Sequence, residues 1–486
     1  MHTDLMAQLP LIFPELLVAL GALVLLLIGV FSGARSYVTI TGLSIALLVA
    51  TIFVVVLSAN DSAFAVNALI VDNFARYMKV LMLVGAIFTL IMSVGFARSD
   101  KLAKFEYPIL MLFAVLGMML MISAGNMLTL YMGLELHSLA LYVLAAFNRD
   151  NVKSSEAGLK YFVLGALSSG MLLYGITLIY GFTGQIGFRE LATVLNGQIP
   201  QLGVIFGIVF ILAGLAFKIS VVPFHMWTPD VYEGAPTPIT AFFASAPKVA
   251  AMALIIRVIV EGFLPLSGVH GALAAWQQIL VFMSIASMAL GAFAAIGQAN
   301  IKRLMAYSSI SHMGYALVGL SAGTAFGIEG VILYMTVYVA MILGSFAFIL
   351  GMRTRDGNVE SIYDLAGLAK NSPFMASVMT IMLFSLASVP PMAGFFVKWY
   401  TFSAAVYAGL IPLVVIGMIA SVISAFYYLR VIKIMWFDEA QQSSSFLPLT
   451  GELKFVLTIT GIFVLFYIFF GIYLSPLAQN AAASLF

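Results

Sequence analysis

"FKISVVPFHMWTPDVYEGAPTPITAFFASAPK", residues 217–248, is the stretch that decides the fold. It contains two lysines, a histidine, an aspartate, a glutamate and five prolines, although the chain on both sides of it is apolar over helical lengths. Proline has no amide hydrogen and clashes with the preceding turn, so it interrupts a helix. In an apolar chain, an interrupted helix with charges is tolerated only where protein or water covers it, which predicts a polar site between helices.

The rest of the chain is strongly apolar. Of its 486 residues, 63% are hydrophobic and 9% are charged, and the mean hydropathy is +1.11. Soluble domains carry about 25% charged residues, and the apolar residues here come in long runs rather than in alternation. The composition therefore predicts an all-α polytopic membrane protein and not a β-barrel. The absence of cysteine excludes disulfides, thiolate nucleophiles and cysteine-held iron–sulfur clusters.

The apolar runs predict about fourteen transmembrane helices. They lie near 11–31, 37–58, 77–96, 108–123, 126–147, 157–182, 203–222, 238–260, 273–296, 303–321, 327–350, 373–408, 410–435 and 455–475. The first run follows a segment without lysine or arginine and is long enough to span, so we expect no cleaved signal peptide. The twelfth run is too long for one straight helix, and Pro390 and Pro391 are predicted to break it.

The distribution of basic residues predicts the orientation, because lysine and arginine are enriched in loops on the inner side of a membrane. With both termini outside, the inner loops carry 14 of the 22 basic residues. Four others fall in outer loops or at span edges, namely Arg76, Lys79, Arg189 and Arg257. This bias supports an even number of spans. We therefore expect a multi-pass protein of the bacterial plasma (inner) membrane with both termini on the outer, periplasmic side.

Four lysines that are not assigned to loops or span edges fall within the predicted spans, and one glutamate joins them. They are Lys160, Lys218, Lys248, Lys398 and Glu135, the last in "LYMGLELHSLALYVL". A charge at the centre of a bilayer costs about 2.5–3.5 kcal/mol on insertion scales. We therefore expect these groups to face protein or water and to carry the chemistry of the chain.

Weak internal similarity suggests a repeat. "EAGLKY" at 156–161 resembles "EGVILY" at 329–334, and "SVVP" at 220–223 resembles "SVPP" at 388–391, with offsets of 173 and 168. The predicted units are an N-terminal three-helix segment (1–107), a first five-helix repeat (108–262), a second repeat inverted in the membrane (263–436), and a C-terminal loop with a last helix (437–486). Paired broken helices in inverted halves are typical of transport sites.

The helix breaks and the charges predict a proton relay. Lys218 precedes Pro223 by five residues, and Lys398 follows Pro391 by seven. Burial disfavours the charged form of a lysine, whereas a nearby carboxylate favours it. If Glu135 approaches Lys218, moving that carboxylate would switch the lysine between holding and releasing a proton. Further candidate stations are Lys248, Lys160, His225 and His312.

Several of these residues also have a simpler interpretation. Lys160 lies near the start of its span and could extend to the membrane surface. His312, in "SSISHMGY", could be a hydrogen-bonded core histidine, and His225 could only cap the break. His137 is expected to be structural. Asp230 and Glu233 lie in the connecting loop and are expected to be solvated, whereas Glu15, at the start of the first span, is expected at an interface.

Other chemistry has no motif in the chain. No glycine-rich dinucleotide or P-loop motif is present, so neither dinucleotide binding nor ATP hydrolysis is expected. The five histidines include no pair at facing helical spacing for haem, and we expect no metal. No basic patch with interleaved aromatic residues points to nucleic acid.

Three motifs resemble a known family. Residues 217–248, "NIKRLMAYSSISHMGY" at 300–315 and "LEL" around Glu135 are similar to motifs of the antiporter-like membrane subunits of respiratory complex I, which also resemble subunits of multi-component cation/proton antiporters. The loop "DVYEGAPTP" and Lys398 in the broken twelfth span resemble the N-type branch of the complex I subunits. The resemblance extends over nearly the whole fourteen-span layout.

The resemblance implies a proton-pumping subunit of a NADH:quinone oxidoreductase. It implies that Glu135 and Lys218 form the ion pair of a first half-channel, that Lys248 is the central lysine, and that Lys398 ends the second half-channel. NADH, FMN, iron–sulfur clusters and quinone would be bound by other subunits, and the partners would be neighbouring antiporter-like and small membrane subunits and the lipid bilayer. Two alternatives stay open, namely a subunit of a multi-component cation/proton antiporter and a membrane scaffold with vestigial charges.

Overall fold

The chain folds into a bundle of long helices. The structure, a computed structural model, describes residues 9–33, 36–58, 62–64, 68–100, 102–197, 200–266, 273–354, 357–439 and 446–486. The first part comprises η1 (Leu9–Ile12), α2 (Phe13–Ser32), α3 (Tyr37–Leu57), β1 (Ser62–Phe64), β2 (Leu69–Val71) and α4 (Asn73–Ser99). Then follow α5 (Glu106–Ser123), α6 (Met127–Ala145), α7 (Val152–Thr183), α8 (Phe188–Leu195), α9 (Leu202–Ile219), α10 (Trp227–Gly234), α11 (Thr237–Ala244), α12 (Ala246–Arg257) and the π-helix η3 (Val258–Phe263).

The second part of the bundle begins after residue 273. It comprises α13 (Ala275–Ile296), α14 (Ile301–Ser321), α15 (Ala325–Gly351), β3 (Arg353–Thr354), β4 (Gly357–Asn358), η5 (Ile362–Leu365), α16 (Leu368–Asn371), α17 (Pro373–Leu386) and α18 (Ala393–Tyr407). The last helices are α19 (Ile411–Phe437), α20 (Gly451–Leu465) and α21 (Tyr467–Ala483). The strands form two short antiparallel pairs, β1–β2 and β3–β4.

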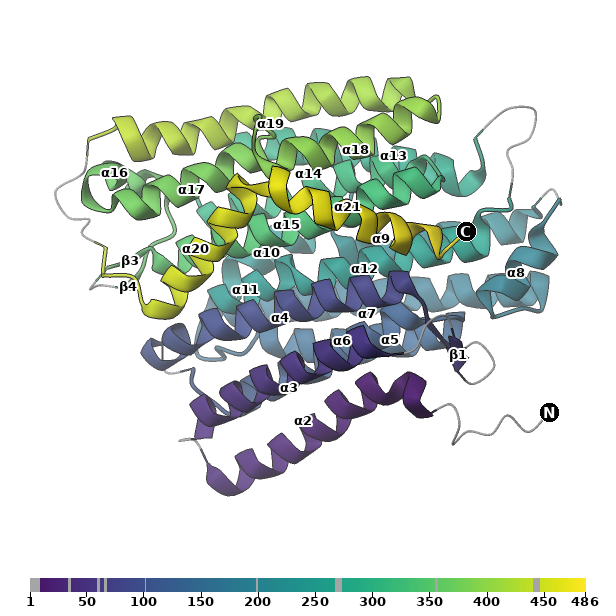
Figure 1. The fold of residues 1–486 in the computed structure, drawn as a ribbon, viewed down its shortest axis with the longest axis horizontal. Helices are drawn as coiled ribbons and strands as arrows, with labels where there is room; N and C mark the ends of the chain where they lie inside the picture. The colour runs from purple at the N-terminus through teal and green to yellow at the C-terminus, as the bar shows by residue number, and fades with distance from the viewer. Residues whose placement is uncertain are drawn as a thin grey trace.

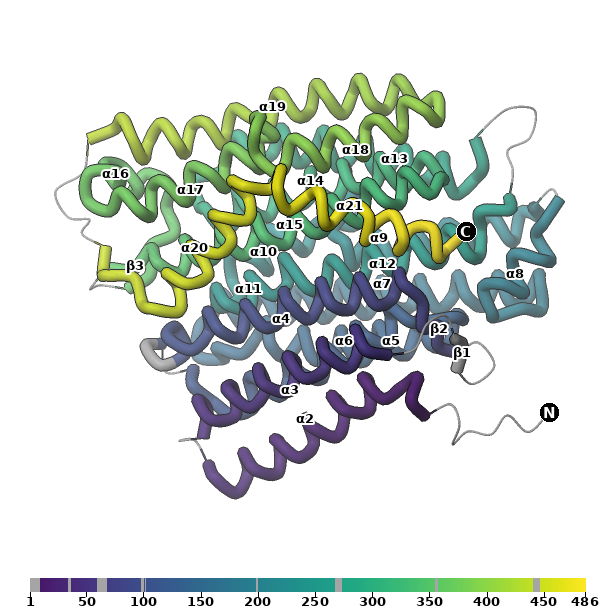
Figure 2. Tube along the Cα trace, viewed as in Figure 1, coloured from purple at the N-terminus to yellow at the C-terminus, as the bar shows by residue number. Residues whose placement is uncertain are grey.

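The long helices lie side by side, and the chain advances across the bundle from α2 and α3 at one edge to α19 at the other (Figures 1 and 2). The last two helices return across the bundle, where they pack on α15, and α21 also reaches α4. A hydrogen bond of 3.1 Å from the Phe74 amide to the Ser484 hydroxyl fixes the end of α21 beside the start of α4. The C-terminus therefore lies at the end of the bundle that carries β1, β2 and α8, here called the hairpin end (Figure 1). The opposite end, which carries α16 and the β3–β4 pair, is called the α16 end.

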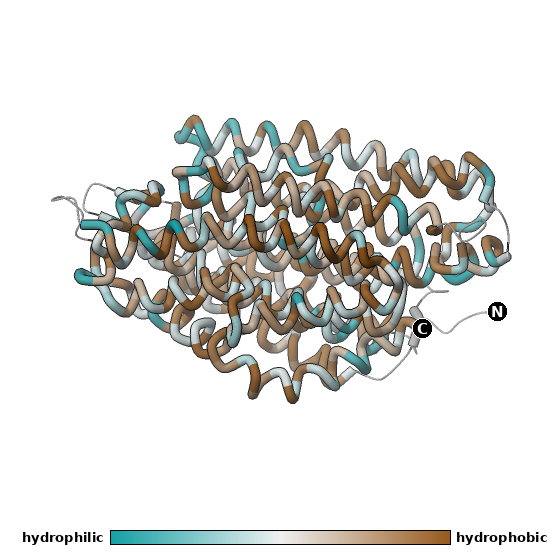
Figure 3. The backbone as a smooth tube through the Cα atoms, turned by 90° about the horizontal axis from the view of Figure 1, so that it is seen from above, coloured by the Kyte–Doolittle hydropathy of each residue, from teal (hydrophilic) through white to brown (hydrophobic). Residues whose placement is uncertain are grey.

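The helices have the length and composition of membrane spans. Within the described residues, eleven helices are individually long and apolar enough to cross a membrane, and α20 with α21 forms one further candidate as a pair bent by 80°. Polar residues are concentrated towards the two ends of the bundle (Figure 3). The chain is thus an all-α, multi-pass membrane protein, as predicted. The count of fourteen stays a prediction, since α14 and the broken pair α17–α18 are not among these candidates.

Two breaks occur at the predicted prolines and share one backbone pattern. Ser220 after α9 and Ser388 after α17 both have positive φ, at 64° and 60°, and the third residue after each is a cis proline, Pro223 and Pro391. At the first break, two freed backbone groups find partners. The Phe217 carbonyl accepts a 3.0 Å bond from the Trp227 indole, and the Val222 amide donates a 2.9 Å bond to a serine of α13. The division into inverted repeats stays a prediction that this pattern supports.

Two interruptions were not predicted. The span predicted over 455–475 is divided at Phe466 into α20 and α21, and the span predicted over 238–260 is divided at Ser245 into α11 and α12. The first has no proline at the break. The bend between α20 and α21 allows α21 to cross over α15 towards α4.

Candidate proton-transfer site

Three buried lysines have the same kind of partner. Lys218 on α9, Lys248 on α12 and Lys398 on α18 are 5%, 1% and 7% exposed. Each Nζ lies within hydrogen-bond distance of one serine hydroxyl, which is Ser138 at 2.7 Å, Ser309 at 2.5 Å and Ser421 at 2.7 Å, respectively. Each Nζ also lies over a tyrosine ring, with distances to the ring centroid of 5.7 Å, 5.8 Å and 4.0 Å. None of the three forms an ion pair with a described residue.

A serine partner is compatible with both protonation states of a lysine. An ammonium donates to the hydroxyl oxygen, and a neutral amine can accept from the hydroxyl hydrogen. A carboxylate in the same place would favour the charged form and would hold the proton. The three lysines therefore lack the described carboxylate partner that would hold the proton of an ion-paired lysine.

The first of these positions is organised by one face of α6. Glu135, Ser138 and Tyr142 are spaced by three and four residues, which places them on successive turns of the same face. Lys218 contacts Ser138 and, at 3.5 Å, the Tyr142 hydroxyl, instead of pairing directly with Glu135. Glu135 is close enough for its charge to act on Lys218, and its Oε1 atom is buried with no hydrogen-bond partner among the described residues. The two predicted partners thus lie in one site, and two hydroxyl groups lie next to Lys218.

A glycine on α7 lets the Tyr142 hydroxyl take this position. A methyl group built at Gly165 would lie 2.1 Å from the hydroxyl oxygen, well inside contact distance. A larger residue at position 165 would displace the tyrosine from Lys218.

The centre of the site is built on α14. Ser309, which contacts Lys248, is 2.5 Å from the Tyr338 hydroxyl of α15. His312, one turn further along α14, contacts Tyr334 through Nδ1 at 2.6 Å and Tyr428 through Nε2 at 3.2 Å. His312 is thus hydrogen-bonded and buried, as its simpler interpretation expected, and it lies within the polar cluster that joins Lys248 to the second half.

The second half of the site opens beside Lys398. The lysine lies at the wall of a cavity of about 500 Å³ between α18 and α19, which is also lined by Phe395, Trp399, Tyr407 and Ser421. On the other side of the lysine, the Tyr315 ring belongs to α14 and continues the face of Ser308, Ser309 and His312. Lys398 is therefore connected to the central cluster through α14.

The structure places Lys160 at the surface of the α16 end. Its side chain is 41% exposed and forms ion pairs of 2.7 Å with Glu156 and Asp230. This is the surface position that its simpler interpretation expected, and it is apart from the buried lysines. His225 is half-buried beside the first break, and its Nδ1 has no side-chain partner in the described part of the chain.

The loop acids Asp230 and Glu233, which were expected to be solvated, are partly exposed and also form ion pairs that the sequence did not predict. Arg303 Nη1 contacts Asp230 at 2.7 Å and Glu233 at 3.0 Å, which ties α10 to the start of α14. Burial would raise the pKa of each carboxyl, but hydrogen bonds from Lys160 and Arg303 to Asp230, and from Lys153 and Arg303 to Glu233, outweigh it, so that both pKa values are lowered. Both acids are ionised at neutral pH and hold this surface together.

Two charges assigned to outer loops or span edges are instead buried in the protein. Lys79 forms a 2.5 Å ion pair with Glu15. Glu15 was expected at an interface, but it is buried as well. Arg257 is fully buried and pairs with Asp72 at 2.9 Å and with Glu261. Counting charges along the chain could not find these ion pairs. Some join residues that are distant in sequence, and one joins residues on successive turns.

The sequence prediction missed the hydroxyl partners. Helical spacing from Glu135 could have found Ser138 and Tyr142, and the "SSISH" run could have found Ser309. No sequence pattern marks Tyr334, Tyr338 and Tyr428 as partners, because tyrosine is common in these apolar helices. His137 is buried as expected, although neither ring nitrogen has a described hydrogen-bond partner.

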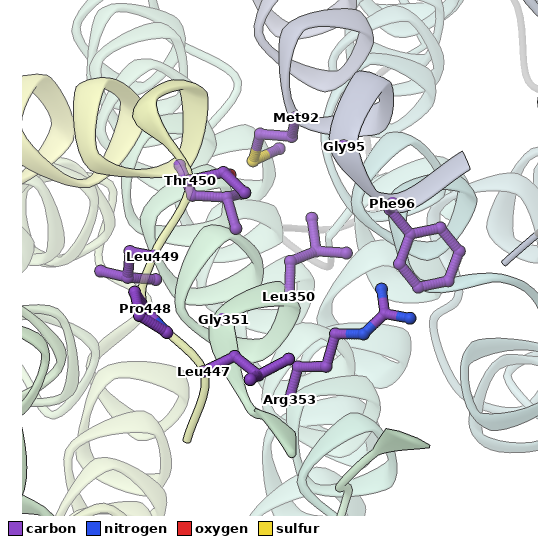
Figure 4. A pocket seen from close by; sticks show the side chains of 11 residues that line it. Met92, Gly95, Phe96, Leu350, Gly351, Arg353, Leu447, Pro448, Leu449 and Thr450 are labelled. Carbon is purple, nitrogen blue, oxygen red and sulfur yellow. The ribbon is translucent and has the colours of Figure 1, made fainter. Parts of the chain in front are cut away.

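A separate cavity lies at the α16 end, away from the lysines. It has a volume of about 330 Å³ and is enclosed by the ends of α4 and α15 and by the segment before α20 (Figure 4). Its lining is apolar apart from Thr450 and Arg353, and the arginine pairs with Asp100 at 3.1 Å. It shares no lining residue with the cavity beside Lys398.

Broken helices and buried ionisable residues within membrane spans are typical of helical ion transporters. Residues 124–424 match the family model described as NADH:quinone oxidoreductase/Mrp antiporter, TM. The chain therefore belongs to this family, as its motifs predicted.

Relatives over the full length agree with this membership. NADH-quinone oxidoreductase subunit N of Bartonella bacilliformis is 71% identical over 486 residues, which covers 100% of this chain and 99% of that protein. NADH-quinone oxidoreductase subunit N 1 of Rhizobium meliloti is 57% identical over 483 residues, with 99% of each covered. A chain in the structure of respiratory complex I from Thermus thermophilus with bound aureothin is 29% identical, with a TM-score of 0.81 and coverage of 96% and 99%.

Proposed function

We propose that this chain is the N-type membrane subunit of a NADH:quinone oxidoreductase and that it moves protons through Glu135, Lys218, Lys248 and Lys398. The observation that carries the proposal is the shared environment of the three lysines, each buried and bonded to a serine instead of a carboxylate. The full-length similarity to subunits of that name supports the assignment to this enzyme.

The residues of the chain would pass a proton in steps. Glu135 acts on Lys218 through its charge, so a change in the protonation or position of Glu135 alters the proton affinity of Lys218. The proton then moves towards Lys248, whose contacts with Ser309 and Tyr338 lead to His312 and the cluster on α14. From there it reaches Lys398. His225 and Lys160 are proposed as peripheral stations only.

The chain is proposed to hold no redox group itself. NADH, FMN, iron–sulfur clusters and quinone are expected in partner subunits, and electron transfer there supplies the energy. The partners are proposed to be neighbouring antiporter-like and small membrane subunits of the same complex.

Purification tests this assignment. An affinity-tagged form of the chain, extracted in mild detergent, should co-purify with flavin, iron–sulfur clusters and NADH:quinone reductase activity. Recovery in a membrane complex without flavin or iron would instead indicate a cation/proton antiporter, and recovery of the chain alone from active membranes would contradict both assignments.

The orientation follows from the basic residues, most of which are assigned to inner loops, so the hairpin end is proposed as the periplasmic end. A reporter fused after Phe486 should therefore be read as outside, and a reporter inserted in the 353–370 segment as inside. The opposite pattern would contradict the proposed orientation.

A further inference from the structure

Among the described residues, four carboxylates are buried in the bundle, and one of these four has no ion pair with a described cation. Glu15, Asp72, Glu261 and Glu329 are all less than 10% exposed. The first three form ion pairs with Lys79 or Arg257, whereas Glu329 forms none with any described residue. Its side-chain contact is with the Ser475 hydroxyl of α21, at 3.0 Å from Oε1. A buried ionisable group in a membrane span without a counter-charge is expensive to keep ionised and is expected to serve a function.

Glu329 lies between Lys398 and the hairpin end. It is in the second turn of α15, which begins at that end, and its helix packs closely on α18. A methyl group built at the neighbouring Gly330 would lie 3.2 Å from the backbone nitrogen of Thr401, one helical turn beyond Lys398. Tyr467 of α21 lies within electrostatic range of Glu329 and adds a further hydroxyl-bearing residue. The carboxylate thus lies beyond Lys398 in the direction of the hairpin end, on the helix that packs on α18.

The predicted repeat places a matching acid at the other end. Glu156 is the fifth residue of α7, and Glu329 is the fifth residue of α15. Each helix follows a side-chain cap, from Asn151 and Thr324 respectively. The two differ in environment, because Glu156 is an exposed residue paired with Lys160, whereas Glu329 is buried and has no cation.

We propose that Glu329 carries protons between Lys398 and the hairpin-end surface. The inference rests on the proposed proton pathway and extends it by one group. In this step an N–H bond of the Lys398 ammonium breaks, an O–H bond forms at the Glu329 carboxylate, and the proton is then lost to water at that surface. The contact with Ser475 suits both states, since the hydroxyl can donate to the carboxylate or accept from the acid.

Two substitutions separate this role from a structural one. Glu329→Gln keeps the length of the side chain and its bond to Ser475 but cannot carry a proton, whereas Glu329→Asp keeps the carboxyl group and shortens the side chain. Proton uptake and quinone reduction are measured together in inverted membrane vesicles and normalised to assembled complex. We expect Gln to lower proton uptake by about tenfold or more, Asp to retain most of it, and Glu190→Gln, an exposed acid of α8 at the same end, to match the unsubstituted protein.

The outcomes divide clearly. Normal proton uptake by Glu329→Gln, or a larger loss with Asp than with Gln, would overturn the inference and leave Glu329 as a structural contact of α21. Lys398→Ala, measured in parallel, distinguishes a failure of this inference from a failure of the proposed proton pathway. If Lys398→Ala loses uptake while Glu329→Gln does not, only this inference fails, whereas normal uptake by Lys398→Ala as well would remove the proposed pathway itself.

Discussion

Replacing Lys218 by alanine should lower proton uptake by about tenfold or more, because the substitution removes a positioned proton-transfer group from the first half of the site. Glu135→Gln should also lower it, since the charge that acts on Lys218 is then absent. Both effects should appear with the complex assembled, because Ser138 and Tyr142 can still bond to each other or to backbone groups. Proton uptake and quinone reduction in inverted vesicles, normalised to assembled complex, provide the measurement.

A matched control is available on the surface. Lys433 is an exposed lysine of α19 with an ion pair to Asp438. Lys433→Ala removes one positive charge and leaves the three buried lysines unchanged. It should pump normally. An assembled Lys218→Ala complex that pumps at the control rate would show that Lys218 is not part of the pathway.

Lys398 allows a test of charge against proton exchange. Arginine keeps its proton under any plausible burial, so Lys398→Arg preserves the positive charge over the Tyr315 ring but should impair proton release. Lys398→Glu restores a titratable group and should be tolerated better than Lys398→Ala, for which we expect a loss of about tenfold or more. A membrane potential acts on each moving charge with about 2.3 kcal/mol per 100 mV, so the defects should be largest in energised vesicles.

The ranking of these three variants is decisive for Lys398. Full pumping by the arginine variant, together with equal failure of the glutamate and alanine variants, would mean that Lys398 supplies only a fixed positive charge. In that case the Ser421 contact would have a packing role and no part in proton exchange.

Much of the fold could be predicted from sequence because length and hydropathy are strong signals. The predicted break at Pro390 and Pro391 is the gap between α17 and α18, and the break at Pro223 follows α9 by four residues. The division at Phe466 could not be predicted, because no proline marks it. The division at Phe466 instead accompanies the packing of α21 on α15 and α4, which is a tertiary effect.

The site was predictable only in part, for a related reason. Glu135, Lys218 and Lys398 are conspicuous because charge is rare in apolar helices, and rarity is visible in a single sequence. Glu329 lies at the edge of its span, and it is distinguished only by having no cation partner among the described residues, which only the packed structure reveals. The serine and tyrosine hydroxyls that contact the lysines are too common in the chain to be noticed before the helices are assembled.

The central claim is that Glu135 and Lys218 act as one proton-transferring unit, and a double-variant cycle tests it most directly. Proton uptake per quinone reduced is measured for Glu135→Gln, Lys218→Ala and the double variant in assembled complexes. Residues that act as a unit show strongly non-additive effects. We predict that the double variant is no more impaired than Lys218→Ala alone. A loss in the double variant equal to the product of the two separate losses, or normal uptake by either single variant, would contradict the account.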